Sequence, residues 1–154
     1  MKITQALLGE HAIFATLFDH LEEQIPQADC AGKVRALGAM LQSALASYAQ
    51  LEETLLFSSL ESVMDTQMGP VAVMRMEHEQ IEGGLEALPS KDEVTSAQRT
   101  LLQVIVTARS HFAKEEQILF PLAAQLLGDE TLEALGEQWA TARHVIEADV
   151  PACA

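Results

Sequence analysis

Apolar residues recur at intervals of three and four along most of the chain, a spacing that places them on one face of an α-helix. Four long stretches carry such stripes, at about residues 5–25, 33–63, 66–88 and 96–127. Segments that contain proline or glycine separate them, such as PQADCAG at 26–32. We therefore expect an all-α fold, an antiparallel up-down four-helix bundle that forms one domain over residues 1–154.

Local sequence signals predict where these helices begin and end. Thr4 is the expected N-cap of the first helix, and Asp65 or Thr66 that of the third, which has Pro70 in its first turn. Gly128 should end the fourth helix, whose last turns Pro121 should kink. A short additional C-terminal helix is expected from about Glu130 to Glu147, and it carries Trp139.

Composition and charge narrow the function classes. Apolar residues make up 49% of the 154 residues, and the formal net charge is −14. The few basic residues are scattered singly, which argues against nucleic acid and anionic membranes as partners. No uncharged run is long enough to span a bilayer, and no signal-peptide core precedes Glu10. Because two cysteines, Cys30 and Cys153, form no disulfide framework, we expect a cytoplasmic protein.

Polar residues interrupt every apolar stripe, and all of them are histidine, glutamate or tyrosine. Buried carboxylates cost several kcal/mol unless a cation compensates them, and no Lys or Arg lies in these stripes. Imidazole and carboxylate groups that converge in a bundle suit iron or manganese. Taken singly, His11, His78 and Tyr48 also fit hydrogen-bonded core positions, and Glu52 also fits an exposed position at the edge of its stripe. Glu82, four residues after His78, lies at the edge of its stripe as well. The candidate metal ligands are His11, Tyr48, Glu52, His78, His111, Glu115 and Glu82.

Axial distances along the helices test whether these residues lie at one level. At a rise of about 1.5 Å per residue, His78 aligns with the pair formed by Tyr48 and Glu52. The same calculation gives a poor match between His78 and His111, unless the segment 83–95 makes a long excursion.

Three motifs resemble those of the hemerythrin-like, or HHE cation-binding, family. The segment HFAKEEQILFP at 111–121 is the most specific, and Glu10-His11 and MEHEQI at 76–81 fit the same family in the same order. The resemblance covers essentially the whole chain. It implies a centre of two non-haem Fe ions (Fe²⁺/Fe³⁺) with a bridging oxo or hydroxo group. His11 and His78 would be terminal ligands, Glu52 and Glu115 would bridge the ions, and His111 would complete the fourth-helix motif.

The sequence departs from the family pattern at two positions. Tyr48 stands where the family has a histidine ligand, and it is the only tyrosine of the chain. A phenolate can ligate ferric iron, so we expect Tyr48 to ligate; the alternative is that it packs nearby and leaves a coordination position open. Glu82 stands where a second third-helix histidine often occurs, and is either a further ligand or marks a vacant position.

The resemblance implies a protein that binds or reacts with O₂, NO or peroxide, with no dedicated organic substrate. The sequence leaves open whether it is an enzyme and what its oligomeric state is. The alternative is a metal-free helical interaction module of the same fold. A ferritin-like oxidase is disfavoured because no Glu-x-x-His occurs in the chain.

Overall fold

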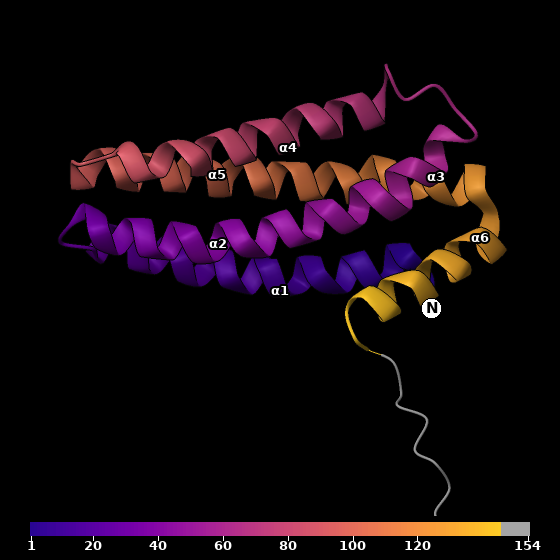
Figure 1. Cartoon of the computed structure of the whole chain (residues 1–154), viewed down its shortest axis with the longest axis horizontal. Helices are drawn as coiled ribbons and strands as arrows, with labels where there is room; N and C mark the ends of the chain where they lie inside the picture. The colour runs from indigo at the N-terminus through magenta and orange to yellow at the C-terminus, as the bar shows by residue number, and fades with distance from the viewer. Residues whose placement is uncertain (146–154) are drawn as a thin grey trace, which may run out of the picture.

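Four long helical rods lie side by side in the computed structural model, which describes residues 1–145 (Figure 1). Successive rods run in opposite directions, as an up-down bundle requires. Within the described residues every element is helical, which confirms the expected all-α fold. The elements are α1 (Ile3–Gln24), η1 (Ile25–Gln27), α2 (Ala31–Leu51), η2 (Glu52–Phe57), α3 (Ser58–Glu61), α4 (Pro70–Ala87), η3 (Leu88–Ser90), α5 (Val94–Lys114), η4 (Glu115–Leu119) and α6 (Phe120–Ala142).

Two of the rods change their hydrogen-bonding pattern part-way along. The second rod runs through α2, η2 and α3, and the fourth runs through α5, η4 and the first turns of α6. Both η2 and η4 are π-helical, whereas η1 and η3 are short 3₁₀ turns at the end of the bundle opposite α6 (Figure 1). Isolated π-helical turns within α-helices are frequently found at functional sites.

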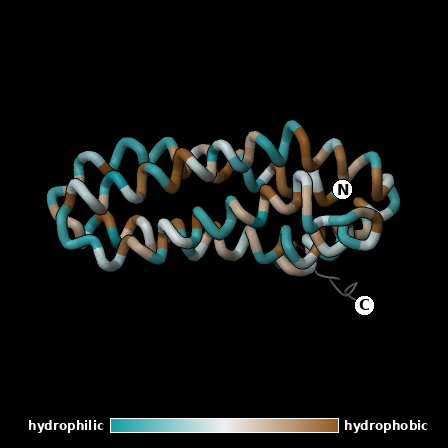
Figure 2. The backbone as a smooth tube through the Cα atoms, turned by 90° about the horizontal axis from the view of Figure 1, so that it is seen from above, coloured by the Kyte–Doolittle hydropathy of each residue, from teal (hydrophilic) through white to brown (hydrophobic). Residues whose placement is uncertain are grey.

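The apolar stripes meet along the axis of the bundle and form one continuous core. Figure 2 shows hydrophobic and hydrophilic stretches alternating along each helix, as amphipathic helices require. Leu41 and Leu101 are fully buried towards the η1 end, and Leu56 and Phe57 are fully buried towards the α6 end. The same stripes carry the polar candidates into this core, so the rods both build the bundle and position the site.

Two helices begin at residues other than those the sequence signals predicted. Lys2 is the N-cap of α1, and the side chain of Gln5 accepts a hydrogen bond from its backbone N–H. Thr4 therefore lies inside the helix and is buried. Gly69 is the N-cap of α4, in a positive-φ conformation that glycine adopts readily, and Pro70 follows in the first turn as expected. Thr66 instead contacts the side chains of Glu61 and Arg75.

The C-terminal helix folds back against α1. Gly128, with φ of 73°, breaks the helical dihedral angles of α6, whereas Pro121, the second residue after the π-helical turn, does not. Beyond Gly128 the chain turns beneath the bundle, and Trp139 and Arg143 both bind the carboxylate of Glu10 (Figure 1). The predicted extra helix is thus present as far as Ala142, and its expected end at Glu147, like Cys153, lies outside the described residues.

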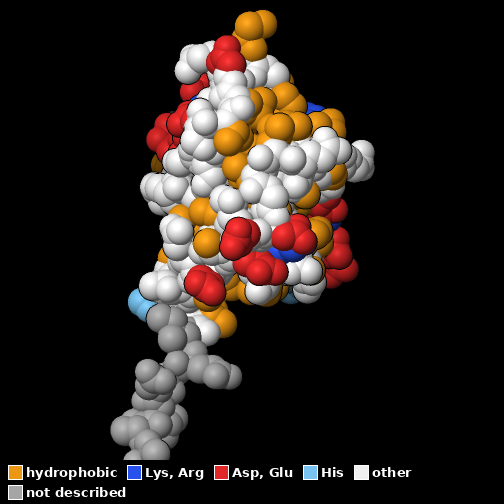
Figure 3. Space-filling model, turned by 90° about the vertical axis from the view of Figure 1, so that its right-hand side faces the viewer, with side chains coloured by type: hydrophobic (Ala, Val, Ile, Leu, Met, Phe, Trp, Pro, Cys, Tyr) orange, Lys and Arg blue, Asp and Glu red, His pale blue; other side chains and the backbone are white. Residues whose placement is uncertain are grey.

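Acidic residues outnumber basic ones, 23 to 9, along the chain. At the end of the bundle where α6 lies, more acidic than basic side chains are visible (Figure 3). An apolar area lies between two groups of these acidic side chains. No helix within the described part of the chain is both long and apolar enough to cross a membrane.

Candidate metal centre

The two core glutamates each begin one of the π-helical segments. Glu52 opens η2 with the sequence EETLLF, and Glu115 opens η4 with the closely similar sequence EEQIL followed by Phe120. Both carboxylates are completely buried. The second and fourth rods run in the same direction and pack against each other, so these π-helical turns place the two carboxylates at one level of the core.

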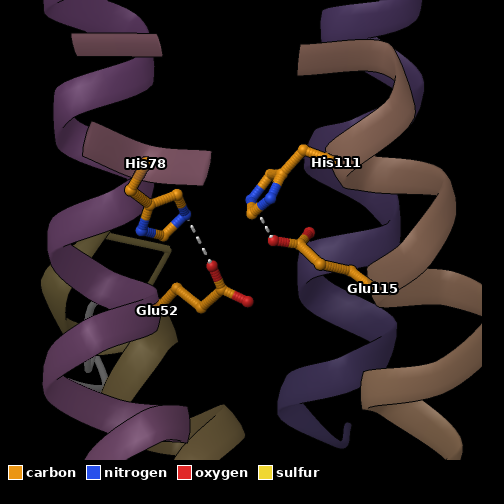
Figure 4. A group of neighbouring side chains, drawn as sticks. All are labelled: Glu52, His78, His111 and Glu115. Atoms are coloured by element: carbon orange, nitrogen blue, oxygen red, sulfur yellow. Dashed lines mark ion pairs between the residues drawn. The ribbon is translucent and has the colours of Figure 1, made fainter. Parts of the chain in front are cut away.

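Four side chains converge at this level: Glu52, His78, His111 and Glu115. One ligand atom from each lies within 4.8 Å of the others. Figure 4 shows Glu52 and His78 on one side of the core facing Glu115 and His111 on the other. His78 Nε2 lies 3.3 Å from Glu52 Oε2, and His111 Nε2 lies 2.5 Å from Glu115 Oε1. The calculated mismatch between His78 and His111 is wrong, because their rings lie 4.6 Å apart.

Several of these converging atoms have no hydrogen-bond partner. Both carboxylate oxygens of Glu52, Nε2 of His78, Nε2 of His111 and Oε1 of Glu115 are buried and unsatisfied among the described residues. An unpartnered buried polar group carries its full desolvation cost, and a buried carboxylate carries a larger one. A cation bound between them would compensate all five atoms, and a set of imidazoles and carboxylates suits iron or manganese. The residues present therefore fit a transition-metal ion.

His11 and Tyr48 lie beside this cluster, and unlike the cluster atoms their polar atoms are hydrogen-bonded. The hydroxyl of Tyr48 donates a hydrogen bond to Glu115 Oε2 at 2.8 Å and lies 2.7 Å from His11 Nε2. Both side chains are buried, and the His11 ring stacks on Phe112 with centroids 4.1 Å apart. Their polar atoms are thus satisfied by one another, so direct metal ligation by Tyr48 stays a prediction.

Glu82 is not brought into the cluster. It is exposed on α4 and lines a cavity of about 420 Å³ between α2 and α4, which His78 and His111 also line. The cavity gives small molecules a path from the surface to the edges of these two imidazoles. Glu82 lies on this path, and its role as a ligand stays a prediction.

Two carboxylates that the sequence reading did not single out hold the histidines. Glu77 accepts a hydrogen bond from His111 Nδ1 at 3.1 Å, and Lys114 in turn donates to Glu77. Glu116 lies 2.8 Å from His11 Nδ1. Both acids directly adjoin candidate ligands in the sequence, which is the signal that could have identified them. Carboxylates on the far ring nitrogen orient metal-binding histidines and fix which nitrogen faces the metal.

Burial and the neighbouring side chains together set the charge states of the cluster. Burial, with the nearby charge of Glu115 second, raises the pKa of Glu52 well above its usual value. Burial likewise raises the pKa of Glu115, but the close approach of the His11 and His111 imidazoles to its oxygens, at 2.8 Å and 2.5 Å, outweighs this and lowers the pKa overall. Burial, and then the charge of His111, lowers the pKa of His78 to about 4, so this imidazole is neutral at pH 7. Burial and the neighbouring carboxylates raise the pKa of Tyr48, which keeps its hydroxyl protonated.

The profile of the family described as "Hemerythrin HHE cation binding domain" matches residues 2–123. The chain belongs to this hemerythrin family. The matched range ends in α6 and includes every one of the candidate ligands, so the hemerythrin domain and the polar cluster coincide. Searches among curated proteins and among solved structures found no match to the chain.

Proposed function

We propose that this hemerythrin-like protein binds a pair of non-haem iron ions in the core of its bundle and that these react with O₂, NO or peroxide. One observation carries the proposal: five buried, unpartnered nitrogen and oxygen atoms of two imidazoles and two carboxylates face one another. When bound, iron supplies the redox chemistry that none of these side chains has. Glu52, His78, His111 and Glu115 would hold the iron, because imidazole and carboxylate groups are donors that suit it.

The remaining residues of the site provide access and protection. The cavity between α2 and α4 admits a small ligand to the edges of His78 and His111. Phe57 stacks against the ring of His78, with centroids 5.8 Å apart, and gives that face of the imidazole an apolar neighbour. Tyr48 holds a proton on Oη, hydrogen-bonded to Glu115, at the boundary of the centre. Such a site is suited to a diatomic ligand or a peroxide.

Iron binding is the direct test. The purified protein is reconstituted anaerobically with ferrous salt, desalted and assayed for iron, beside a variant with His111→Ala and Glu115→Ala. The matched control carries His20→Ala and Glu23→Ala, because these residues are exposed on α1. We expect iron in the wild type and the control and its loss in the cluster variant. Equal iron content in all three proteins contradicts the proposal.

Reactivity is measured on the same ferrous samples. Separate mixing with O₂, NO and hydrogen peroxide is followed by visible absorbance, with the cluster variant as blank. A spectral change with at least one of the three, absent from the variant, supports the proposal. No iron in the wild type, together with thermal unfolding that a chelator leaves unchanged, supports instead the metal-free interaction module.

A further inference from the structure

The site is built from two similar helix pairs, α1 with α2 and α4 with α5. Tyr48, Glu52, Glu53 and Phe57 of the first pair have the same spacing as His111, Glu115, Glu116 and Phe120 of the second. Glu10-His11 in α1 likewise corresponds to Glu77-His78 in α4. Both pairs place the first glutamate at the start of a π-helical segment. The correspondence makes Tyr48 the counterpart of His111 and Glu10 the counterpart of Glu77.

The two helix pairs differ in the residue available to the carboxylate, which is His111 for Glu77 and Tyr48 for Glu10. Glu77 binds Nδ1 of His111 in the second pair. Tyr48 offers no ring nitrogen in the first pair, and Glu10 is instead bound by Trp139 at 2.5 Å and by Arg143 at 2.6 Å. Glu10, the counterpart of Glu77, is therefore hydrogen-bonded to the C-terminal helix and not to a ligand of the site.

The two halves of the site also differ in how far their ring nitrogens and hydroxyl are hydrogen-bonded. We call His78 with His111 the open side and His11 with Tyr48 the closed side. On the open side, Nε2 of both histidines is unpartnered. On the closed side, His11 contacts Glu116 through Nδ1 and Tyr48 through Nε2, and the Tyr48 hydroxyl also binds Glu115. An ion bound to His11 Nε2 on the closed side has to displace the hydrogen bond between His11 and Tyr48 and the one from Tyr48 to Glu115, whereas Nε2 of His78 and of His111 on the open side have no hydrogen bond to lose.

We propose that the two metal positions are unequal: the open side, with Glu52 and Glu115, binds one divalent ion tightly, and the closed side binds a second ion only weakly. The inequality rests on the proposed function, since both positions belong to that centre. It assigns Tyr48 a specific effect, which is to separate the two binding events, and it makes Glu10 the residue that would hold a histidine placed at position 48.

Titration with Co²⁺ measures the occupancy of each position without any redox reaction. Binding to the full chain is followed by calorimetry and by cobalt absorbance. We expect one tight equivalent and a second that is weaker by about tenfold or more, since several hydrogen bonds must break. His78→Ala should weaken the tight equivalent by about 100-fold, whereas its counterpart His11→Ala should leave it within about threefold and remove the weak one. Two equal equivalents, or equal effects of the two substitutions, overturn the inequality.

Substitution at position 48 tests the cause. Tyr48→His should tighten the second equivalent until it approaches the first, and adding Glu10→Gln should reverse part of that gain by about tenfold. Glu10→Gln alone should leave both equivalents of the wild type unchanged. The first equivalent, measured in the same titration, reports whether each variant is folded. A second equivalent that stays weak in a Tyr48→His protein with an intact first equivalent overturns the role of Tyr48. Binding of neither Co²⁺ nor Fe²⁺ by the wild type overturns the proposed function as well.

Discussion

Glu77 and His111 are joined across two helices by a hydrogen bond of 3.1 Å to Nδ1, which leaves Nε2 of the imidazole facing the buried carboxylate of Glu115. Glu77 is itself almost fully buried and is further bound by Lys114. A chain of charged groups thus runs from the surface lysine to the centre of the core. It fixes both the orientation of the His111 ring and the nitrogen that carries the proton.

Glu77→Gln should weaken metal binding without removing a ligand. The amide keeps the shape of the side chain but lacks the charge that orients His111 and raises its basicity, so we expect a loss of about 10–100-fold in affinity. Co²⁺ titration measures it. The matched control is Glu86→Gln, the same change at an exposed position on the same helix, which should have no effect. Equal affinities of the two variants would show that Glu77 does not act on the site.

Glu52→Gln should stabilise the metal-free protein at alkaline pH. Burial raises the pKa of Glu52, so its contribution to stability is complete below about pH 4.5 and is lost as the pH rises through the raised value. The variant and the wild type, unfolded with urea in the presence of a chelator, should differ little at pH 5. By pH 8 the variant should be more stable by on the order of 1 kcal/mol, because one pKa unit corresponds to about 1.4 kcal/mol. A difference that does not change with pH contradicts this.

Periodicity predicted the architecture because it depends only on which residues face the core. The spacing of Leu41, Leu101 and their neighbours is a property of the α-helix, and the bundle follows from four such stripes. Helix starts were harder to predict. Thr4 and Thr66 both have capping side chains, but the chain begins its helices at positions fixed by Gln5 and by the positive φ of Gly69.

The polar site could be predicted only in part, because periodicity does not show which residues of different helices meet. The stripes identify residues that face the core, such as Glu52 and Glu115, but not the carboxylates that reach them from another helix. Glu77 contacts a residue 34 positions away and Glu116 one 105 positions away. The axial count failed between His78 and His111 because it assumed uniform α-helix, whereas a 3₁₀ turn at Leu88–Ser90 lengthens the connection.

The adjacent glycines of α4 should respond in opposite directions to alanine. A Cβ at Gly83 meets no atom within 4 Å, so Gly83→Ala should stabilise the protein by about 0.5–1 kcal/mol through helix propensity. A Cβ at Gly84 would lie 2.5 Å from Cγ2 of Val104, a stiff β-branched side chain of α5. Gly84→Ala should therefore destabilise the protein by about 1–3 kcal/mol. Urea unfolding measures both, and a stabilising Gly84→Ala would show that α5 yields at this contact.

Arg143 should hold the C-terminal helix on the bundle. It binds the half-buried carboxylate of Glu10 at 2.6 Å and also donates to Ser47, so it ties the end of α6 to both α1 and α2. Arg143→Ala should cost about 1–2 kcal/mol, since bonds between charged groups are stronger than neutral ones. Trp139, the only tryptophan, binds the same carboxylate, so its fluorescence should report the loosening as well as unfolding in urea. The control is Arg99→Ala at an exposed position of α5, which should change the free energy of unfolding by less than about 0.5 kcal/mol. Identical unfolding curves and identical Trp139 emission in the two variants would mean that Trp139 and apolar packing alone hold the helix in place.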